Sequence, residues 1–365
     1  MKLIYISAVP WKSVSQRPHF FAKYALENEV DELLWIEPYP SRFPNISDLN
    51  LARYRSEPHG VKVLPGLKVI SMRNVVPIEP AIPIFKLLNR AALKKVIDEV
   101  KHFITSETIL VVGKPCLLSS ILISKFDWKS IWFDAMDDFP SFYKGISKIH
   151  MRKMEDMIAD NSDKVICSSH ALIDKFSRKG LCNKLKLVLN ACENSLERIK
   201  QSSKCDSIDK KLVFGYIGTI SNWFDWDWTI NLAASNPSCI VRLIGPMKIR
   251  KPFNLPSNIH IEPAIPHYEI MQTLSTFDFA IIPFKQNELT KHVDPVKYYE
   301  YSLAGKIILS TPFGEMIWHY KKNEGLISKL SNIIKIPLGT LIISNDNKVP
   351  RWNARFSQLF FSDQG

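Results

Sequence analysis

The chain has 365 residues, about two to two and a half times the usual size of a domain, which predicts two domains or one large α/β unit. It is 46% hydrophobic, 23% charged and 11% aromatic, which excludes a wholly disordered chain, and it lacks the roughly 18 consecutive apolar residues that a membrane helix needs. Lysine and arginine exceed aspartate and glutamate by 48 − 36 = 12, which favours anionic partners such as nucleic acid, anionic lipid or phosphorylated small molecules.

Six cysteines are scattered at spacings that match no zinc or redox pattern, and no Cys-x-x-Cys occurs. We therefore predict reduced, mostly buried thiols. The first residues, MKLIYIS, are too short an apolar stretch for a secretory signal and lack a small-residue cleavage site. We expect them to form the first buried strand of a cytoplasmic enzyme.

Short apolar runs alternate with helix-like stretches in the first half, which is the pattern of βα units around a parallel sheet. Strands are predicted at Lys2–Ser7, Glu32–Ile36, Val61–Leu64 or Leu67–Ser71, Thr108–Val112, Ser130–Phe133 and Lys164–Cys167. Helices are predicted at Pro18–Leu26, Ile84–Phe103, Lys148–Asp160 and Ala171–Lys179, the last with Ser168 or Ser169 as its N-cap.

Near residue 195 the sequence becomes polar and charged without apolar periodicity, as in a connector. We predict a first domain over residues 1–195, a linker over 196–211 and a second domain over 212–346. The strands of the second domain are predicted at Leu212–Ile217, Ile240–Ile244, Ile259–Ile261, Phe279–Ile282 and Lys306–Ser310.

The segment DPVKYYEYSLAGKIILST, residues 294–311, carries the most chemical information. It predicts a helix over Pro295–Leu303 that begins with proline and ends at Gly305, where a left-handed cap is cheap. Lys297 and Glu300 share a face of this helix. Lys297 adds its charge to the positive end of the helix, which suits phosphates, and Glu300 can accept protons from ribose hydroxyls. A solvated ion pair is the alternative.

This segment resembles the donor-binding stretch of GT-B glycosyltransferases, in which a proline-initiated helix carries a lysine and ends in E-Y-L-A-A-G-K-P-V-V. The resemblance implies that Glu300 binds the nucleotide ribose and Lys297 the donor phosphates. It implies in addition that Pro295 and Tyr298 belong to the donor-binding helix.

Other segments resemble motifs of the bacterial subgroup that makes capsule, teichuronic acid and related surface polysaccharides. They follow the family's order and are PWKSVSQRPHFFAKYAL, IWFDAMDDF, MEDMIADNSDKVICSSHAL, KLVLNACE and LVFGYIGTISNWFDWDW. The resemblance implies an α/β GT-B fold of two Rossmann-like domains facing a central cleft. Residues 1–195 would bind the acceptor and 212–346 the donor, and residues 347–365, with PRWNARFSQLFF, would form a helix that packs back toward the first domain.

The sequence departs from the family pattern in three places. The family's glycine-rich loop after the first strand is replaced by Val9–Arg17, which contains no glycine. His292 stands where retaining families often have a second glutamate, so a retaining mechanism is in doubt. In the element before the linker, Ala191 replaces glycine and Glu193 replaces aspartate.

Three carboxylates follow a predicted strand of the first domain, at the edge where open α/β sheets place their sites. Inverting sugar transfer needs a carboxylate to take the acceptor proton, and close carboxylates raise one another's pKa. We predict Asp137 as this base, with Asp138 as the alternate and Asp134 as structural. The alternative is that these acids cap the next turn.

Further binding residues are predicted in both domains. Gly218 and Thr219 follow the first strand of the second domain, where N–H groups can approach a diphosphate; a simple tight turn is the alternative. Trp223, Trp226 and Trp228 suit a sugar platform or burial. In the first domain, Arg17 and His19 open the first helix, and they are the predicted contacts to an anionic acceptor.

Residues 75–104 combine a proline-broken apolar run with a basic helix, which suits either an anionic membrane surface or an ordinary helix covering the sheet.

The sequence thus predicts a metal-independent glycosyltransferase that uses a UDP or GDP sugar as co-substrate, has no other cofactor and binds no nucleic acid. Its acceptor would be a bacterial surface glycan or a lipid-linked precursor. The protein would be cytoplasmic or peripheral on the inner membrane face. A non-catalytic GT-B scaffold, and less favourably a nucleic-acid-binding protein, are the alternatives.

Overall fold

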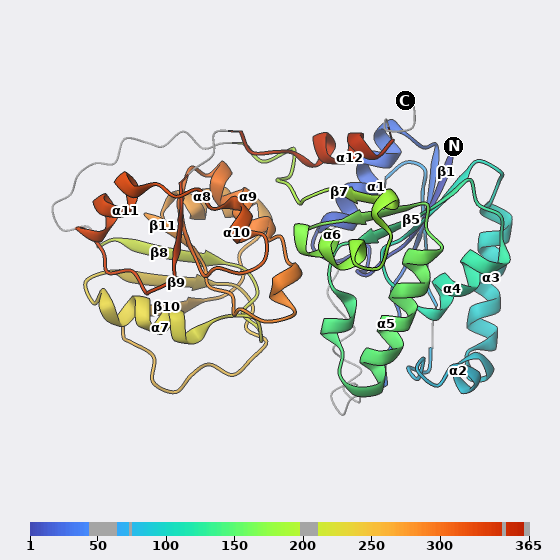
Figure 1. The fold of residues 1–365 in the computed structure, drawn as a ribbon, viewed down its shortest axis with the longest axis horizontal. Coiled ribbons are helices and arrows are strands. Elements are labelled where there is room, and N and C mark those ends of the chain that lie inside the picture. Colours follow the sequence, from blue (N-terminus) through green and yellow to red (C-terminus); the bar gives the residue numbers. More distant parts are fainter. Residues whose placement is uncertain (44–63, 73–74, 198–210, 345–347, 361–365) are drawn as a thin grey trace. The chain divides into compact units, whose positions relative to one another are not determined.

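The computed structural model describes residues 1–43, 64–72, 75–197, 211–344 and 348–360. The chain divides into two compact units, Met1–Leu189 with Phe356–Gly365, and Asn190–Arg355 (Figure 1). The division precedes the predicted linker, most of which lies outside the described residues.

The first unit contains a seven-stranded sheet in the order β3-β2-β1-β4-β5-β6-β7. Each neighbouring pair of strands is parallel. The strands are β1 (Lys2–Ile6), β2 (Glu32–Ile36), β3 (Leu67–Ile70), β4 (Thr108–Val112), β5 (Ser130–Ala135), β6 (Lys164–Cys167) and β7 (Leu185–Leu187). The third strand is therefore the second of the two predicted alternatives. Strand order reverses between β1 and β4, which is where doubly wound sheets leave a crevice.

Helices and short 3-10 turns connect these strands (Figure 1). They are α1 (Arg17–Asn28), α2 (Ile82–Leu88), α3 (Arg90–Phe103), α4 (Leu117–Lys125), η3 (Phe139–Phe142), α5 (Gly145–Asp160), α6 (His170–Ser177) and η4 (Cys182–Lys184). Ser169 is the N-cap of α6, as predicted, and its side chain accepts from Leu172 N.

The prediction of one helix over Ile84–Phe103 is wrong, because the helix is interrupted at Asn89, between α2 and α3. The Asn89 amide donates to the carbonyls of Phe85 (3.0 Å) and Val76 (3.2 Å), and its Oδ1 accepts from Val76 N (2.8 Å). These bonds tie the break to the segment before α2.

The second unit contains a six-stranded sheet in the order β10-β9-β8-β11-β12-β13. Its strands are β8 (Val213–Ile217), β9 (Ile240–Ile244), β10 (Ile259–Glu262), β11 (Phe279–Ile282), β12 (Ile307–Ser310) and β13 (Leu341–Ile343). All pairs are parallel except β12 with β13. The helices and 3-10 turns are α7 (Trp226–Ser235), η5 (His267–Glu269), α8 (Ile270–Ser275), η6 (Thr290–His292), α9 (Val296–Leu303), α10 (Met316–His319) and α11 (Glu324–Ser331).

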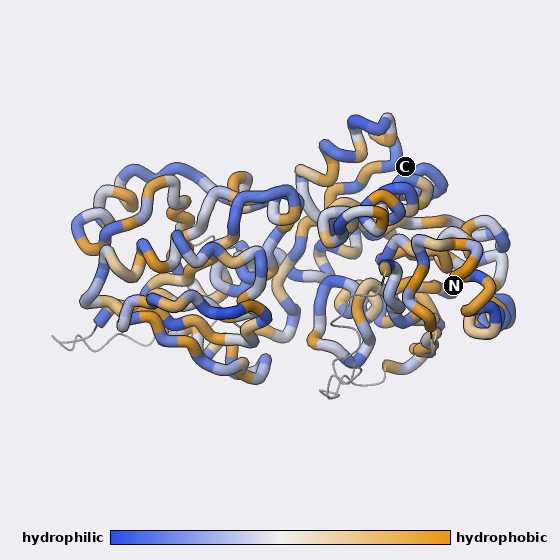
Figure 2. Tube along the Cα trace, turned by 90° about the horizontal axis from the view of Figure 1, so that it is seen from below, coloured by the Kyte–Doolittle hydropathy of each residue, from blue (hydrophilic) through white to orange (hydrophobic). Residues whose placement is uncertain are grey.

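Each unit has its own hydrophobic core, built on strands whose side chains are buried on both faces. Hydrophobic and hydrophilic stretches alternate along the chain trace of both units (Figure 2). The two sheets, each with its own core, confirm the predicted two parallel-sheet α/β domains. Four of the five described cysteines are buried free thiols, but Cys182 is exposed, because it lies in a short turn at the surface rather than in a strand.

The C-terminal helix α12 (Trp352–Phe360) contributes its last residues to the first unit. The ring of Phe356 lies 5.3 Å from that of Phe21, centroid to centroid, and Phe360 lies 5.0 Å from Trp132. Lys164 Nζ donates to the carbonyl of Leu359 (3.1 Å). These aromatic contacts hold the end of α12 beside α1 and β5.

Candidate functional site

The first group of polar side chains lies at the carboxyl end of β5. Asp134 is buried, and its carboxylate accepts hydrogen bonds from Tyr5 Oη (2.7 Å) and Arg17 Nε (2.9 Å). Arg17 also donates to the carbonyl of Val188 (2.7 Å). This network ties β5 to β1, to α1 and to the segment after β7, which gives Asp134 a structural role.

Asp138 is also held by neighbouring side chains. It is buried, its Oδ1 lies 2.5 Å from Lys175 Nζ, and its Oδ2 accepts from the Ser141 hydroxyl. Lys175 also pairs with Glu155 on α5 (2.5 Å), and burial raises the pKa of Glu155 to about 7. The carboxylate of Asp138 therefore belongs to a buried network of charged groups.

Asp137 differs from both neighbours. It is half-buried and has no hydrogen bond or ion pair to any residue in the described ranges. Burial raises the pKa of its carboxyl group to about 7, the Arg17 charge opposes that rise, and the charges of Asp138 and Asp134 add to it. A carboxyl group with a pKa near 7 can take up a proton at neutral pH. Within this triplet, Asp137 is the group suited to proton transfer.

Arg17 and His19, the predicted acceptor contacts, are both buried. His19 Nδ1 accepts from Gln16 N (3.1 Å), and its Nε2 lies 3.1 Å from the carbonyls of Pro10 and Trp11. Burial lowers the pKa of His19. In this structure both side chains hold the start of α1, and their contact with an acceptor stays a prediction.

The second group of polar side chains lies on α9. Pro295 was predicted as the first residue of this helix. It is the N-cap instead, and the first helical residue is Val296. The helix ends as predicted at Gly305, whose φ of 72° is in the left-handed region. The N–H groups of Gly305 and Lys306 donate to the carbonyls of Ser302 and Tyr301 (3.0 Å each).

The end of β8 lies directly against α9. The N–H of Ile217 donates to Tyr301 Oη (2.9 Å), and a Cβ on Gly218 would lie 2.3 Å from Lys297 Cε and 2.6 Å from its Nζ. The φ of Gly218 is +146°, a value that other residues rarely adopt. Glycine at this position lets the Lys297 side chain lie against the backbone that follows β8.

Thr219 follows in the same turn. It is half-buried, and its carbonyl accepts from Tyr216 Oη (2.9 Å). The ring of Tyr216 also contacts Lys297, whose Nζ lies 5.5 Å from the ring centroid. The turn after β8 and the first turn of α9 thus form one group around the lysine.

Lys297 and Glu300 are two half-buried charged side chains on α9. Neither side chain makes a hydrogen bond or ion pair with the part of the chain that is described. Burial lowers the pKa of Lys297 and raises that of Glu300, and the charge of each opposes the shift of the other. Because buried charges in proteins are normally paired, these two side chains are suited to a polar ligand.

Asp294, just before α9, was not predicted to matter. It is buried; its Oδ2 accepts from Asn190 N (2.7 Å) and Tyr299 Oη (2.8 Å), and its Oδ1 lies 3.2 Å from His319 Nε2. The His319 ring stacks on Tyr298, with centroids 3.7 Å apart. Tyr298 is therefore packed on a neighbouring ring, and its donor contact stays a prediction.

Two signals for this network are present in the sequence. Asp294 precedes the proline that starts α9, and Asn190 belongs to the KLVLNACE motif. Their partnership spans 104 residues, and the Asn190 amide also donates to the Asp294 carbonyl (2.6 Å). An aspartate before a helix is ordinarily read as a cap, so this role was missed.

Comparisons with known proteins bear on the fold. No protein-family model matches the sequence. The chain can be superposed on sucrose-phosphate synthase of Thermosynechococcus elongatus with a TM-score of 0.61, at 13% identity over 88% of this chain and 83% of that one. A lipopolysaccharide outer core galactosyltransferase, WaaB, gives 0.59 at 12% identity over 99% of both chains. HepE of Anabaena, solved in complex with UDP, gives 0.56 at 13% identity over 88% and 84%.

The chain has the GT-B glycosyltransferase fold. A curated relative from Bacillus subtilis, TuaH, is named as a teichuronic acid biosynthesis glycosyltransferase and is 24% identical over 211 residues. The match covers 52% of this GT-B chain and 52% of the relative, so the chain spans about half the length of that protein.

Two further features of the GT-B chain bear on its site. In the described ranges, no group of three or more His, Cys, Asp and Glu side chains could hold a metal ion. Trp226 and Trp228 are buried in the core of the second unit, which supports burial rather than a sugar platform for these two residues. Trp223 is half-buried against the same core.

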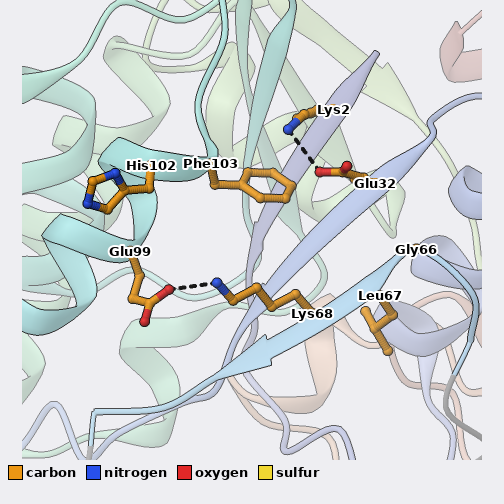
Figure 3. Close-up of a pocket in the computed structure, with 8 residues that line it drawn as sticks. All are labelled: Lys2, Glu32, Gly66, Leu67, Lys68, Glu99, His102 and Phe103. Atoms are coloured by element: carbon orange, nitrogen blue, oxygen red, sulfur yellow. Dashed lines mark hydrogen bonds and ion pairs between the residues drawn. The ribbon is translucent and has the colours of Figure 1, made fainter.

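Figure 3 shows a pocket of about 420 Å³ at the opposite, amino-terminal edge of the first sheet. Lys2 pairs there with Glu32 (2.9 Å), and Lys68 pairs with Glu99 (2.6 Å). Phe103 lies between the two ion pairs (Figure 3). These charges are already paired, whereas Asp137 and the charges on α9 have no ion pair within the described residues. The candidate groups therefore lie at the carboxyl edge of the sheet in each unit.

Proposed function

We propose that this chain is a glycosyltransferase that moves a sugar from a nucleotide-diphosphate donor to a bacterial surface polysaccharide or its lipid-linked precursor. The observation that carries the proposal is the group formed by Gly218, Lys297 and Glu300 at the carboxyl edge of the second sheet. The relative TuaH and the fold neighbour HepE, which binds UDP, support this choice of reaction and ligand.

The second unit would bind the donor. Lys297 and the backbone N–H groups at the start of α9 would hold the diphosphate, because positive charge and helix dipoles favour phosphate oxygens. Glu300, one turn further on, would accept hydrogen bonds from the ribose hydroxyls. Thr219 would offer its backbone N–H group to the diphosphate, and Pro295 sets the start of the helix. The N–H of Gly218 already donates to the carbonyl of Ile244 (2.8 Å), so Gly218 would contribute by leaving room for the Lys297 side chain.

Lys297 would also assist the chemical step. When the bond between the sugar and the diphosphate breaks, negative charge develops on the leaving phosphate oxygen, and a fixed positive charge stabilises it. Burial has already removed much of the water around Lys297, so its charge acts more strongly on the ligand.

The first unit would supply the base. We assign the role to Asp137, which would take the proton of the acceptor hydroxyl as that oxygen attacks the anomeric carbon. Asp138, the alternate, is bound to Lys175 and Ser141 and is less free to accept a proton.

We further propose that transfer needs no metal, because Lys297 and backbone N–H groups would carry the charge of the diphosphate. Transfer should then be unchanged by EDTA. Loss of activity in EDTA, restored by a divalent cation, would contradict this part of the proposal.

We place the protein in the cytoplasm, peripheral to the inner membrane face, where a lipid-linked acceptor would be found. None of the described helices is both long and apolar enough to cross a membrane.

A screen of nucleotides for thermal stabilisation tests the function. A ligand that binds only the folded protein raises its melting temperature, so UDP or GDP should stabilise it. A non-catalytic scaffold would respond to neither nucleotide, and a nucleic-acid-binding protein would instead show salt-dependent binding to DNA or RNA. The Lys297→Ala variant should lose the stabilisation, and Lys291→Ala, at an exposed lysine just before α9, is the matched control.

A further inference from the structure

A group of large apolar side chains is exposed on two elements of the first unit, helix α2 and the segment from η3 into α5. We call this the α2–α5 surface. Its apolar members are Ile84 (53% exposed), Leu87 (72%), Leu88 (56%), Phe142 (51%), Ile146 (66%) and Ile149 (59%).

The exposed side chains lie on defined faces of their helices. In α2, Phe85 is fully buried and its ring stacks on Tyr39, with centroids 5.8 Å apart. The exposed Ile84, Leu87 and Leu88 follow i, i+3, i+4 spacing, so they form a stripe directed away from that anchor. In the second segment, Ile146 and Ile149 are three residues apart on α5 and share a face, and Phe142 is exposed at the end of the preceding turn η3.

The two elements border the same part of the unit. Glu79, just before α2, has its Oε1 3.1 Å from His150 Nε2 on α5. Ser41, two residues after Tyr39, has its Oγ 3.3 Å from the hydroxyl of Tyr143, which lies two residues before the start of α5. α2 and the start of α5 lie at the same end of the first unit (Figure 1).

The charges of this surface are of one sign. Residues 81–97 and 139–154 contain no aspartate or glutamate. The basic side chains next to the apolar stripes are Lys86, Arg90, Lys144, Lys148, Arg152 and Lys153. All are exposed except Lys148, which is half-buried, and none forms an ion pair with the described residues.

We propose that the α2–α5 surface docks the protein on an anionic lipid bilayer. Projecting aliphatic and aromatic side chains surrounded by lysine and arginine match the boundary between acyl chains and anionic headgroups. Nucleic acid would use the basic charges but would leave the aliphatic side chains in water. Exposed apolar groups gathered in one place mark an interaction site rather than an ordinary surface.

The α2–α5 surface would present a lipid-linked acceptor to the first unit, a role that rests on the proposed function. Phe142 follows Asp137 by five residues, so the docking surface begins five residues after the assigned base in the chain. Docking there would bring a lipid-linked acceptor to the first unit from the membrane side. The binding of lipid itself does not depend on glycosyl transfer.

Sedimentation with vesicles tests the proposal on the full chain. The protein should sediment with vesicles of phosphatidylcholine and phosphatidylglycerol, and about tenfold less with phosphatidylcholine alone, because the basic residues need anionic lipid. The double variant Leu87→Ser/Ile146→Ser and the charge variant Lys144→Glu/Lys148→Glu should each weaken binding to anionic vesicles by about tenfold or more. Leu338→Ser, at a fully exposed leucine of the second unit, should bind as the wild type does.

The proposal is overturned if the wild type does not bind anionic vesicles, or if both double variants bind them as well as the wild type. Self-association that both variants abolish, without vesicle binding, would assign the surface to a second copy and also overturn it. The nucleotide-induced rise in melting temperature should be the same in all variants. Vesicle binding without nucleotide binding would support the docking surface and contradict the proposed function. Nucleotide binding without vesicle binding would support the proposed function and contradict the docking surface.

Discussion

Replacing Asp137 by asparagine should stabilise the protein while removing sugar transfer. The carboxyl group of Asp137 has a pKa of about 7 in the folded protein, against 3.8 ordinarily, because burial disfavours its ionised form. The protonated carboxyl group therefore stabilises the folded protein relative to the ionised group. This stabilisation is fully present below about pH 4 and is lost as the pH rises to about 7. Asparagine does not ionise, so the variant should escape this loss.

The magnitude follows from the pKa. A rise of about three units corresponds to roughly 4 kcal/mol at pH 8, at about 1.4 kcal/mol per unit. Because Asp137 is half-buried and solvent screens part of its charge, we expect a gain of about 2 kcal/mol. The gain should be smaller at pH 5, where wild-type Asp137 is still protonated in the folded state.

Urea unfolding at pH 5 and pH 8 measures this effect. The Asp138→Asn variant is the control and should change stability in the opposite direction, by about 2 kcal/mol, because it weakens a buried pair with Lys175. Equal or lower stability of Asp137→Asn at pH 8 would refute the reasoning about its ionisation. Wild-type transfer rates in that variant would move the base to Asp138 or outside the triplet.

Two further predictions concern the second unit. Gly218→Ala should lower nucleotide affinity by about tenfold or more, because its φ of +146° suits glycine and the new Cβ would displace the Lys297 side chain; unchanged affinity in a calorimetric titration would contradict that geometry. Asp294→Ala should lower the free energy of unfolding by about 3 kcal/mol, because it leaves Asn190 N and Tyr299 Oη without their acceptor; a loss below about 1 kcal/mol in urea unfolding would show that the network contributes little.

Most strands were predictable from the sequence for a physical reason. A parallel strand covered on both faces is a continuous apolar run that ends at turn residues, so β2, β4 and β6 match their predicted bounds. The three-residue strands β7 (Leu185–Leu187) and β13 (Leu341–Ile343) were missed because they are too short to show a pattern.

The break between α2 and α3 could not be read from local sequence. Asn89 interrupts a stretch rich in helix-forming residues because its side chain bonds to Val76, thirteen residues earlier. Such a contact exists only after the segment has folded against its neighbour.

The residues of the candidate site could be proposed from the sequence, but the ion pairs and hydrogen bonds of their side chains could not. Motif positions placed Lys297, Glu300 and Gly218 together, and the contact of Gly218 with Lys297 agrees. The difference between Asp137 and Asp138 depends on Lys175, which is 37 residues from Asp138 in the chain and reaches it from α6. Only the tertiary structure shows which carboxylate is paired.

The most direct test of the central claim is calorimetric titration of UDP and GDP into the wild-type protein and the variants Lys297→Ala and Glu300→Ala. We predict that one nucleotide binds the wild type and that each variant binds it about tenfold or more weakly while melting as a folded protein. Equal affinity in both variants and the wild type, or no binding of either nucleotide to the wild type, would contradict the assignment of the donor site to α9.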